Sequence, residues 1–177
     1  WSAALLVASA ASAADAPRLA AVSATFWAAE SAAPAAEVAT DDTALAALPA
    51  DLSFRLTLAG PGEYRAVREL LCSQGLENRV HFVGALQRTK LAEQMRRSHL
   101  ILSSSRVETF GMTLAEALCV GRPVVSTDSG GPRDIVRPQD GHLVPVGDSA
   151  AMSEAIVDLL GRYDEYDPAA IAAAARR

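Results

Sequence analysis

The chain has 177 residues, a length typical of one domain that is large enough to bury a real core. Half of the residues are hydrophobic, which excludes an intrinsically disordered chain. The formal net charge is −5, from 16 basic and 21 acidic residues, and this balance argues against a nucleic-acid-binding protein, which normally carries a basic face.

The first 50 residues are rich in alanine and poorly patterned, and we expect them to form an altered or truncated start of the domain. Within them, Leu19–Ser31 is predicted to form a helix, and residues 40–51 a short helix or loop. The chain opens on Trp1 with no initiating methionine, which suggests a fragment of a longer protein. Its apolar first 14 residues are too short to span a bilayer, so we interpret them as a buried segment of that truncated start.

Strands and helices alternate through the second part of the chain, residues 51–177. Strands are predicted at Ser53–Ala59, Arg79–Val83, His99–Ser103 and Pro123–Thr127, and helices at Glu63–Gln74, Lys90–Ser98 and Phe110–Val120. This alternation predicts an α/β fold, a Rossmann-like parallel sheet with helices on both faces. Ligands of such folds bind where the strands end, and the positions that fall there are Gly60, Gly84, Glu108, Phe110 and Gly130.

The chain is organised around one stretch, Ser103–Gly131, with the sequence SSSRVETFGMTLAEALCVGRPVVSTDSGG. Its central helix is predicted to begin after an N-cap at Thr109 and to stop at Gly121. Glu116 lies in the middle of this otherwise apolar helix. Because a carboxylate there is costly without a hydrogen-bond partner, it needs either a ligand or a neighbouring cation such as Arg133.

The start of the same helix is a predicted anion site. Backbone N–H groups of Phe110, Gly111, Met112 and Thr113 point from the positive end of the helix dipole, and a glycine lets a ligand approach closely. The Gly130–Gly131 pair could add amides from the neighbouring loop. Two acids, Glu108 and Glu116, flank this anion site. Together these features indicate a sugar diphosphate, with the acids binding hydroxyls and the amides binding phosphates.

The motif S-x-x-E-x-F-G-x-x-x-x-E-A-x-x-x-G-x-P-V-V-x-x-x-x-G-G resembles the donor-binding signature of the retaining, nucleotide-sugar-dependent glycosyltransferases. These family 4-like enzymes combine two Rossmann-like domains (the GT-B architecture) and share an E-x7-E pair. The similarity extends over about Leu52–Leu160, far more than a lone glycine motif. It implies a C-terminal donor-binding domain that transfers a hexosyl group with retention from a nucleotide diphosphate sugar to an acceptor hydroxyl.

The resemblance also assigns roles to individual residues. Glu108 would be the catalytic residue and would hold the donor sugar. The diphosphate and sugar site would comprise Glu108, Phe110, Gly111, Met112, Thr113, Gly130 and Gly131. The nucleotide would be bound by Glu116 through its ribose, together with Gly84, Leu86 and Gly60. No metal or further cofactor is implied, and the partners would be the nucleotide-sugar donor and an acceptor sugar, lipid or small molecule. A domain outside this chain could add a peripheral membrane contact.

The chain departs from the family pattern at one place, and this leaves other functions possible. The family places an Arg/Lys pair in a G-R-x-x-x-x-K-G loop near the start of this domain, yet Arg18 is the only basic residue before Asp51. Arg88 and Lys90 are the remaining candidates to reach phosphate, unless they are surface charges. The alternatives are a non-catalytic fragment that binds a nucleotide or a partner, an epimerase or phosphorylase of the same architecture, and a purely structural fragment.

The histidines and cysteines indicate whether the chain binds a metal and whether it is in a reducing compartment. The three histidines, His81, His99 and His142, show no metal-ligand spacing, so we expect structural or surface roles. The two cysteines, Cys72 and Cys119, fall in predicted helices, and nothing in their placement calls for a disulfide. The sequence therefore predicts a reduced, cytoplasmic protein.

Overall fold

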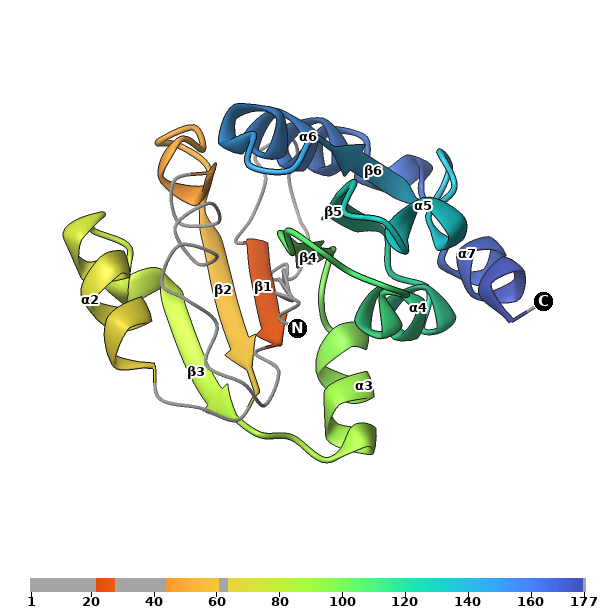
Figure 1. Cartoon of the computed structure of the whole chain (residues 1–177), viewed down its shortest axis with the longest axis horizontal. Helices are drawn as coiled ribbons and strands as arrows, with labels where there is room; N and C mark the ends of the chain where they lie inside the picture. Colours follow the sequence, from red (N-terminus) through yellow and green to blue (C-terminus); the bar gives the residue numbers. More distant parts are fainter. Residues whose placement is uncertain (1–21, 28–43, 61–63, 177) are drawn as a thin grey trace, which may run out of the picture.

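The computed structural model describes residues 22–27, 44–60 and 64–176. Within these ranges six parallel strands form two three-stranded sheets, ordered β1-β2-β3 and β4-β5-β6. The strands are β1 (Val22–Trp27), β2 (Phe54–Ala59), β3 (Val80–Gly84), β4 (Ile101–Ser103), β5 (Val124–Thr127) and β6 (Gly141–Val144). β1 and β4 lie side by side, so the chain order reverses between them (Figure 1).

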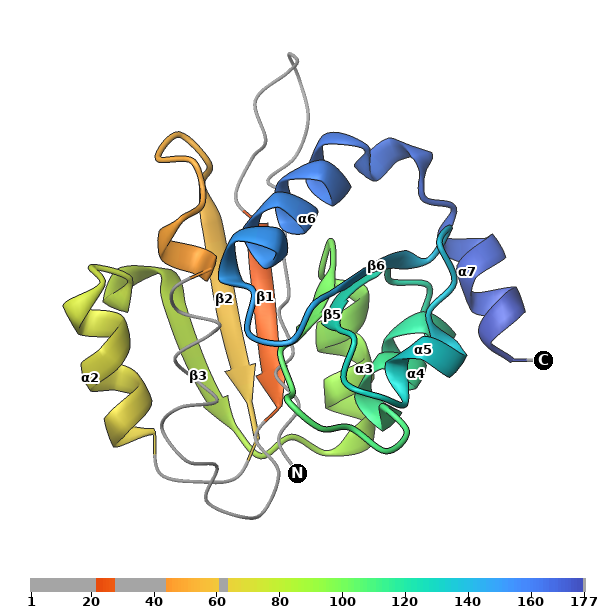
Figure 2. The ribbon, with the colours of Figure 1, turned by 45° about the horizontal axis from the view of Figure 1, so that its top comes forward.

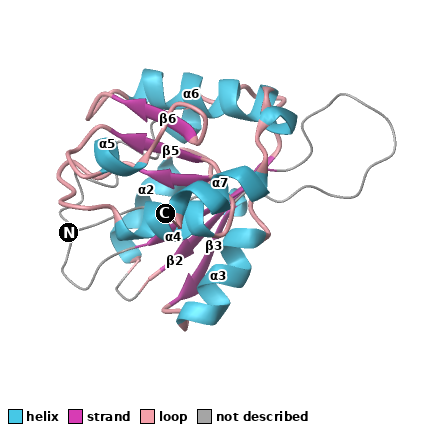
Figure 3. Cartoon of the chain, turned by 90° about the vertical axis from the view of Figure 1, so that its right-hand side faces the viewer, coloured by secondary structure: helices cyan, strands magenta, loops and turns pink. Residues whose placement is uncertain are grey.

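Helices cover both sides of these strands (Figure 2). They are α2 (Arg65–Ser73), α3 (Arg88–Arg96), α4 (Met112–Cys119), α5 (Pro132–Ile135), α6 (Ser149–Gly161) and α7 (Pro168–Ala175), with 3-10 turns η1 (Glu77–Arg79) and η2 (Tyr163–Glu165). The strands change direction steadily from β6 to β3 (Figure 3), the twist expected of a parallel sheet. The predicted Rossmann-like α/β fold is confirmed. None of the helices in the described ranges is long and apolar enough to cross a membrane.

Successive residues along β4 and β5 belong to two separate buried clusters, one on each side of the strands. Leu102 of β4 and Val125 of β5 belong to the cluster beneath α2 and α6. Their neighbours Ile101 and Val124 belong to the cluster beneath α3, α4 and α7. Side chains of successive strand residues point to opposite faces, so two clusters mean two covered faces.

The helix predicted over Leu19–Ser31 is wrong, because its described part is strand β1. This strand pairs in parallel with β2 over its whole length, from Val22 opposite Phe54 to Trp27 opposite Ala59. Alanine favours helix locally, but β-branched and aromatic residues in VSATFW suit a strand, and the partner strand decides the outcome. The predicted buried segment at residues 1–14 and the first four residues of the predicted 40–51 segment lie outside the described residues.

The remaining predicted elements are present with shifted ends, and one shift matters for the site. α3 begins at Arg88, two residues earlier than predicted. Arg88 therefore occupies the first turn of α3, directly after the loop that leaves β3. The short helix expected before β2 is present at residues 44–46, where Ala44 and Leu45 are buried in the core.

Candidate functional site

The site is built around the start of α4, at the carboxyl ends of the strands. α4 begins at Met112, and its N-cap is Gly111 in the left-handed conformation, with φ 90° and ψ 47°. The expected cap at Thr109 is wrong, because α4 begins three residues later and Gly111 occupies the N-cap position. Gly111 has no side chain, so the N-cap residue accepts no side-chain hydrogen bond from the first turn of α4. The positive end of this helix is therefore left open to an anion.

Glu108 lies in the loop before α4, and its backbone is fixed to the neighbouring loop. Its N–H donates to the Ser129 carbonyl at 3.0 Å, and the Gly131 N–H donates to the Glu108 carbonyl at 2.7 Å. Its half-buried side chain turns toward α4, where Oε1 accepts from the Phe110 N–H at 3.3 Å. The carboxylate is thus held in front of the open helix start by the backbone on both sides of it.

The Gly130–Gly131 pair forms the other half of this backbone junction. A Cβ on Gly131 would lie 2.5 Å from the Cα and N of Phe110, and one on Gly130 would lie 2.9 Å from the Glu108 carbonyl oxygen. Both glycines are required by close packing alone. The Gly131 N–H already donates to the Glu108 carbonyl, so it is not free to donate to a diphosphate. The predicted contact of Gly131 with a diphosphate would have to be made by other atoms.

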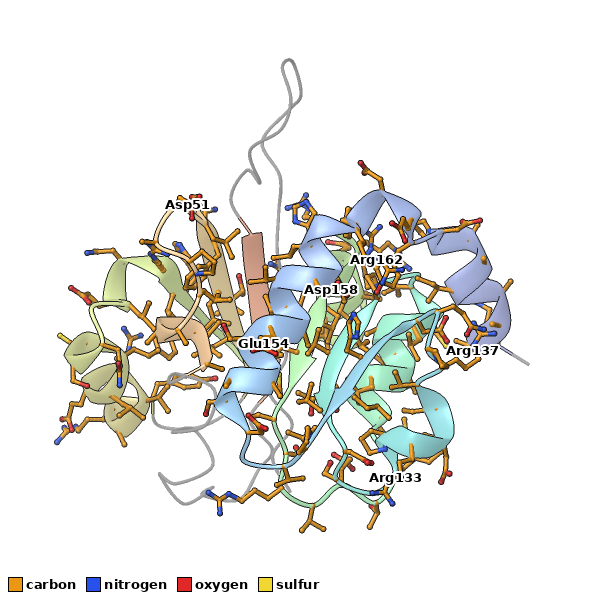
Figure 4. All side chains as sticks on the ribbon, turned by 90° about the horizontal axis from the view of Figure 1, so that it is seen from above. Asp51, Arg133, Arg137, Glu154, Asp158 and Arg162 are labelled. Carbon is orange, nitrogen blue, oxygen red and sulfur yellow. The ribbon has the colours of Figure 1, made fainter. Side chains whose placement is uncertain are left out.

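Glu116 lies one turn into α4 and pairs with Arg88. Its Oε1 accepts from Nε of Arg88 at 3.1 Å and from Nη2 at 2.9 Å. The Arg88 side chain is 80% exposed and that of Glu116 29%. Arg133, the cation suggested from the sequence, instead pairs with Asp128, and this carboxylate raises the pKa of the Arg133 guanidinium. Arg133 lies at the periphery of the molecule, as does Arg137 (Figure 4).

An apolar groove of about 350 Å³ runs between α3 and α4 beside the Arg88–Glu116 pair. It is lined by Arg88, Leu91, Ala92 and Met95 from α3 and by Phe110, Met112, Ala115, Glu116, Cys119 and Val120 from α4 and its flanks. Phe110 and Met112 are half exposed at its mouth. The volume is within the range of small-molecule sites.

Sequence reasoning missed this groove, although a signal was present. Arg88, Leu91, Ala92 and Met95 follow the i, i+3, i+4, i+7 spacing of one helix face, and so do Met112, Ala115, Glu116 and Cys119. Each set alone indicates only a packed face. That the two faces border one groove depends on the placement of the helices, which the spacing does not give.

Three of the four residues predicted to contact the nucleotide, Gly60, Gly84 and Leu86, lie where β2 and β3 end and the chain leads into α3. The fourth, Glu116, is on α4. The Gly60 N–H donates to the Gly84 carbonyl at 2.9 Å, so the ends of these two strands are joined. A side chain on Gly84 would meet nothing within 4 Å, whereas its φ of 66° favours glycine. Leu86 is half-buried against the core beneath α3. The sequence turn after Gly60 includes residues 61–63, which lie outside the described ranges.

Within the described part of the chain, no group of three or more His, Cys, Asp or Glu residues is placed to hold a metal ion. His142 lies against Asp158 of α6, with Nε2 3.0 Å from Oδ2, and His99 packs edge-on against Tyr163. His81 is exposed on β3.

Comparison with known proteins gives relatives that include two mycobacterial mannosyltransferases. The chain is 35% identical over 108 residues to the phosphatidyl-myo-inositol mannosyltransferase of Mycobacterium leprae, covering 60% of this chain and 28% of that protein. It is 33% identical over 128 residues to the GDP-mannose-dependent alpha-mannosyltransferase of Mycobacterium tuberculosis, covering 71% and 32%. The chain thus spans about a third of the length of the curated relatives it matches.

Solved structures agree with this comparison. Anabaena Alr3699/HepE in complex with UDP-glucose matches with a TM-score of 0.67 and 27% identity, over 77% of this chain and 39% of that one. The sucrose-phosphate synthase of Thermosynechococcus elongatus matches with a TM-score of 0.68 and 27% identity, over 73% and 34%. The family model for glycosyl transferases group 1 matches residues 35–162. The chain belongs to this family of glycosyltransferases and has the fold of one half of the GT-B architecture.

Proposed function

We propose that the chain is the donor-binding domain of a retaining glycosyltransferase that transfers a hexosyl group from a nucleotide diphosphate sugar to an acceptor hydroxyl. One observation carries the proposal. The start of α4 lacks a side-chain cap and lies between two carboxylates, Glu108 in the preceding loop and Glu116 one turn on. An uncapped helix start attracts phosphate, and carboxylates accept hydrogen bonds from sugar hydroxyls.

Each part of the donor then has a partner. The amides of Gly111, Met112 and Thr113 take the diphosphate, since the Phe110 N–H already donates to Glu108. Glu108 binds the transferred sugar and Glu116 the ribose. The base lies beside Gly84 and Leu86, where the chain leads into Arg88 and the groove. Relatives support a nucleotide-sugar donor: one is named as GDP-mannose-dependent, and one solved neighbour is a complex with UDP-glucose.

In this proposal the site supplies binding and charge stabilisation rather than a base. The acceptor proton passes to the donor phosphate itself, and the helix amides stabilise the charge that develops on the leaving diphosphate. We place the reaction in the cytoplasm. The acceptor, a sugar, a lipid or a small molecule, is selected by the part of the longer relatives that this chain does not span.

A second candidate is a binding-only domain, and one sequence observation favours it. The first 50 residues contain a single basic residue, Arg18, where the family carries its Arg/Lys pair. Without those cations a leaving diphosphate loses a main source of stabilisation. Donor hydrolysis or transfer by a longer protein that contains this domain separates the two candidates, because a binding-only domain would retain the nucleotide and release no sugar.

The proposal is tested by calorimetric titration with UDP, GDP and ADP, each with and without its sugar. One diphosphate should bind with micromolar to millimolar affinity, and Glu116→Ala should weaken it. Asp158→Ala on α6 is the matched control, since it removes a half-exposed helical carboxylate on a different helix. If none of the three diphosphates binds the folded protein, the proposed function is wrong.

A further inference from the structure

We propose that Arg88 exchanges partners when the donor binds, leaving Glu116 and moving onto the diphosphate. This inference rests on the proposed function and adds a binding residue that the family motif does not contain. The observation behind it is that the carboxylate assigned to the ribose is already occupied. Both Arg88 hydrogen bonds go to one oxygen, Oε1 of Glu116.

The ribose and Arg88 compete for the same acceptor. Two vicinal hydroxyls are best accommodated by two carboxylate oxygens, and in the described structure Oε1 of Glu116 is taken by the guanidinium. The pair is open to water on the arginine side, where the side chain is 80% exposed, so its separation costs little. A bound ribose can therefore displace the guanidinium at a modest cost.

The proposed diphosphate site borders the groove that Arg88 lines, so the displaced guanidinium would meet an anion there. Arg88 lines this groove together with Phe110 and Met112, which stand at the open start of α4. Among the described residues that line it, Arg88 is the one that carries a positive charge. Two other cations that the sequence suggested are paired elsewhere, Lys90 with Glu93 and Arg133 with Asp128.

A guanidinium also suits the task chemically. Its fork of N–H donors matches two phosphate oxygens as well as it matches a carboxylate, and it keeps its charge at any working pH. A diphosphate carries more negative charge than Glu116 and offers more acceptor oxygens. The exchange would place one cation beside the leaving diphosphate. The first 50 residues of this chain lack the Arg/Lys pair that would otherwise contact it.

The exchange predicts opposite effects of one substitution on two ligands. A nucleoside has ribose but no phosphate, so Arg88 only competes with it. A nucleoside diphosphate gains the arginine as a partner. Arg88→Gln should therefore tighten the nucleoside by about threefold, the factor that corresponds to an exposed ion pair. It should weaken the diphosphate by about tenfold or more, as expected for a charge-assisted contact.

The experiment is a calorimetric titration of the whole chain and its variants with guanosine and GDP and with uridine and UDP. Lys90→Gln is the matched control, because it removes a cation from the same helix that does not line the groove. It should change neither affinity. Arg88→Lys, which keeps the charge and loses the fork, should recover part of the diphosphate affinity, and the melting temperature of each variant reports its folding.

The outcomes separate this inference from the proposed function. If the unaltered protein binds none of these diphosphates nor ADP, the proposed function fails and the exchange falls with it. If it binds a diphosphate but Arg88→Gln leaves both affinities unchanged, or shifts both in the same direction, the exchange is overturned while the proposed function stands. Opposite shifts support the exchange.

Discussion

Replacing Gly131 with alanine tests whether the backbone junction between the Glu108 loop and the start of α5 holds the site. Gly131 has φ −47° and ψ −36°, a conformation that alanine adopts without strain. The obstacle is space alone. The new Cβ would lie 2.5 Å from two backbone atoms of Phe110, against ordinary contacts of 3.4–4 Å.

The expected magnitude follows from these distances. The backbone of Phe110 must withdraw by about 0.9 Å, the difference between 3.4 and 2.5 Å. Overpacking of this kind costs about 1–3 kcal/mol. The hydrogen bond from the Gly131 N–H to Glu108 is strained by the same movement, at about 1 kcal/mol more. A total near 3 kcal/mol would lower the melting temperature by about 6–12 °C for a domain of this size.

The assay is thermal unfolding followed by circular dichroism, together with titration by the nucleoside diphosphate that binds. Gly161→Ala is the control, because it also places alanine at a helical position but meets nothing within 4 Å. It should leave stability unchanged or raise it by up to about 1 kcal/mol. If Gly131→Ala melts like the unaltered protein and binds as well, the junction does not hold the site and the reasoning is refuted.

Three smaller changes probe the surface, a helix cap and a half-buried phenol. Phe110→Ala should lower the free energy of unfolding by less than about 1 kcal/mol, since Phe110 is 52% exposed. It should also weaken binding of the diphosphate, and an unchanged affinity in titration would contradict this. Asp167 caps α7, because its carboxylate accepts from the Ala169 N–H at 2.8 Å and from the Ala170 N–H at 3.2 Å. Asp167→Ala should therefore lower the melting temperature by about 2–4 °C, and Asp167→Asn, which can still cap the helix, should lower it by less. Burial raises the pKa of the Tyr166 phenol above 10.0, so its contribution to stability is complete below about pH 10 and falls at higher pH. Tyr166→Phe should make the urea midpoint decline less steeply above pH 10, and an identical decline would be evidence against this.

The sequence was sufficient for the fold where strands carry apolar runs bounded by glycine. Val124–Thr127 follows a glycine and a proline, is wholly buried, and was predicted to within one residue. β1 was missed because its alanine-rich surroundings fit a helix as well as a strand, and its pairing with β2 joins residues about 30 positions apart. Local propensity cannot report such a partner.

The same distinction applies to the site: features set by neighbouring residues could be predicted, and contacts between distant residues could not. The motif identified Glu108 in the loop and Glu116 within the following helix, because both lie within one short stretch of sequence. The N-cap was placed wrongly since Thr109 has the usual cap chemistry, whereas the left-handed turn at Gly111 depends on backbone geometry. The partner of Glu116 could not be chosen from the sequence, because Arg88 is 28 residues away and meets it only through the packing of α3 beside α4.

The uncapped start of α4 is consistent with the proposed binding of a diphosphate there. A Ser, Thr, Asp or Asn at the N-cap would stabilise the helix by about 1 kcal/mol relative to a residue without that side chain, although a glycine there loses only a few tenths. The chain therefore keeps the amides free at small cost and gains room for a ligand to approach them. The backbone of Glu108 is held by hydrogen bonds to Ser129 and Gly131, and its carboxylate accepts from the Phe110 N–H at 3.3 Å. An acid held beside unoccupied donors is suited to binding the hydroxyls of a ligand whose phosphates occupy those donors.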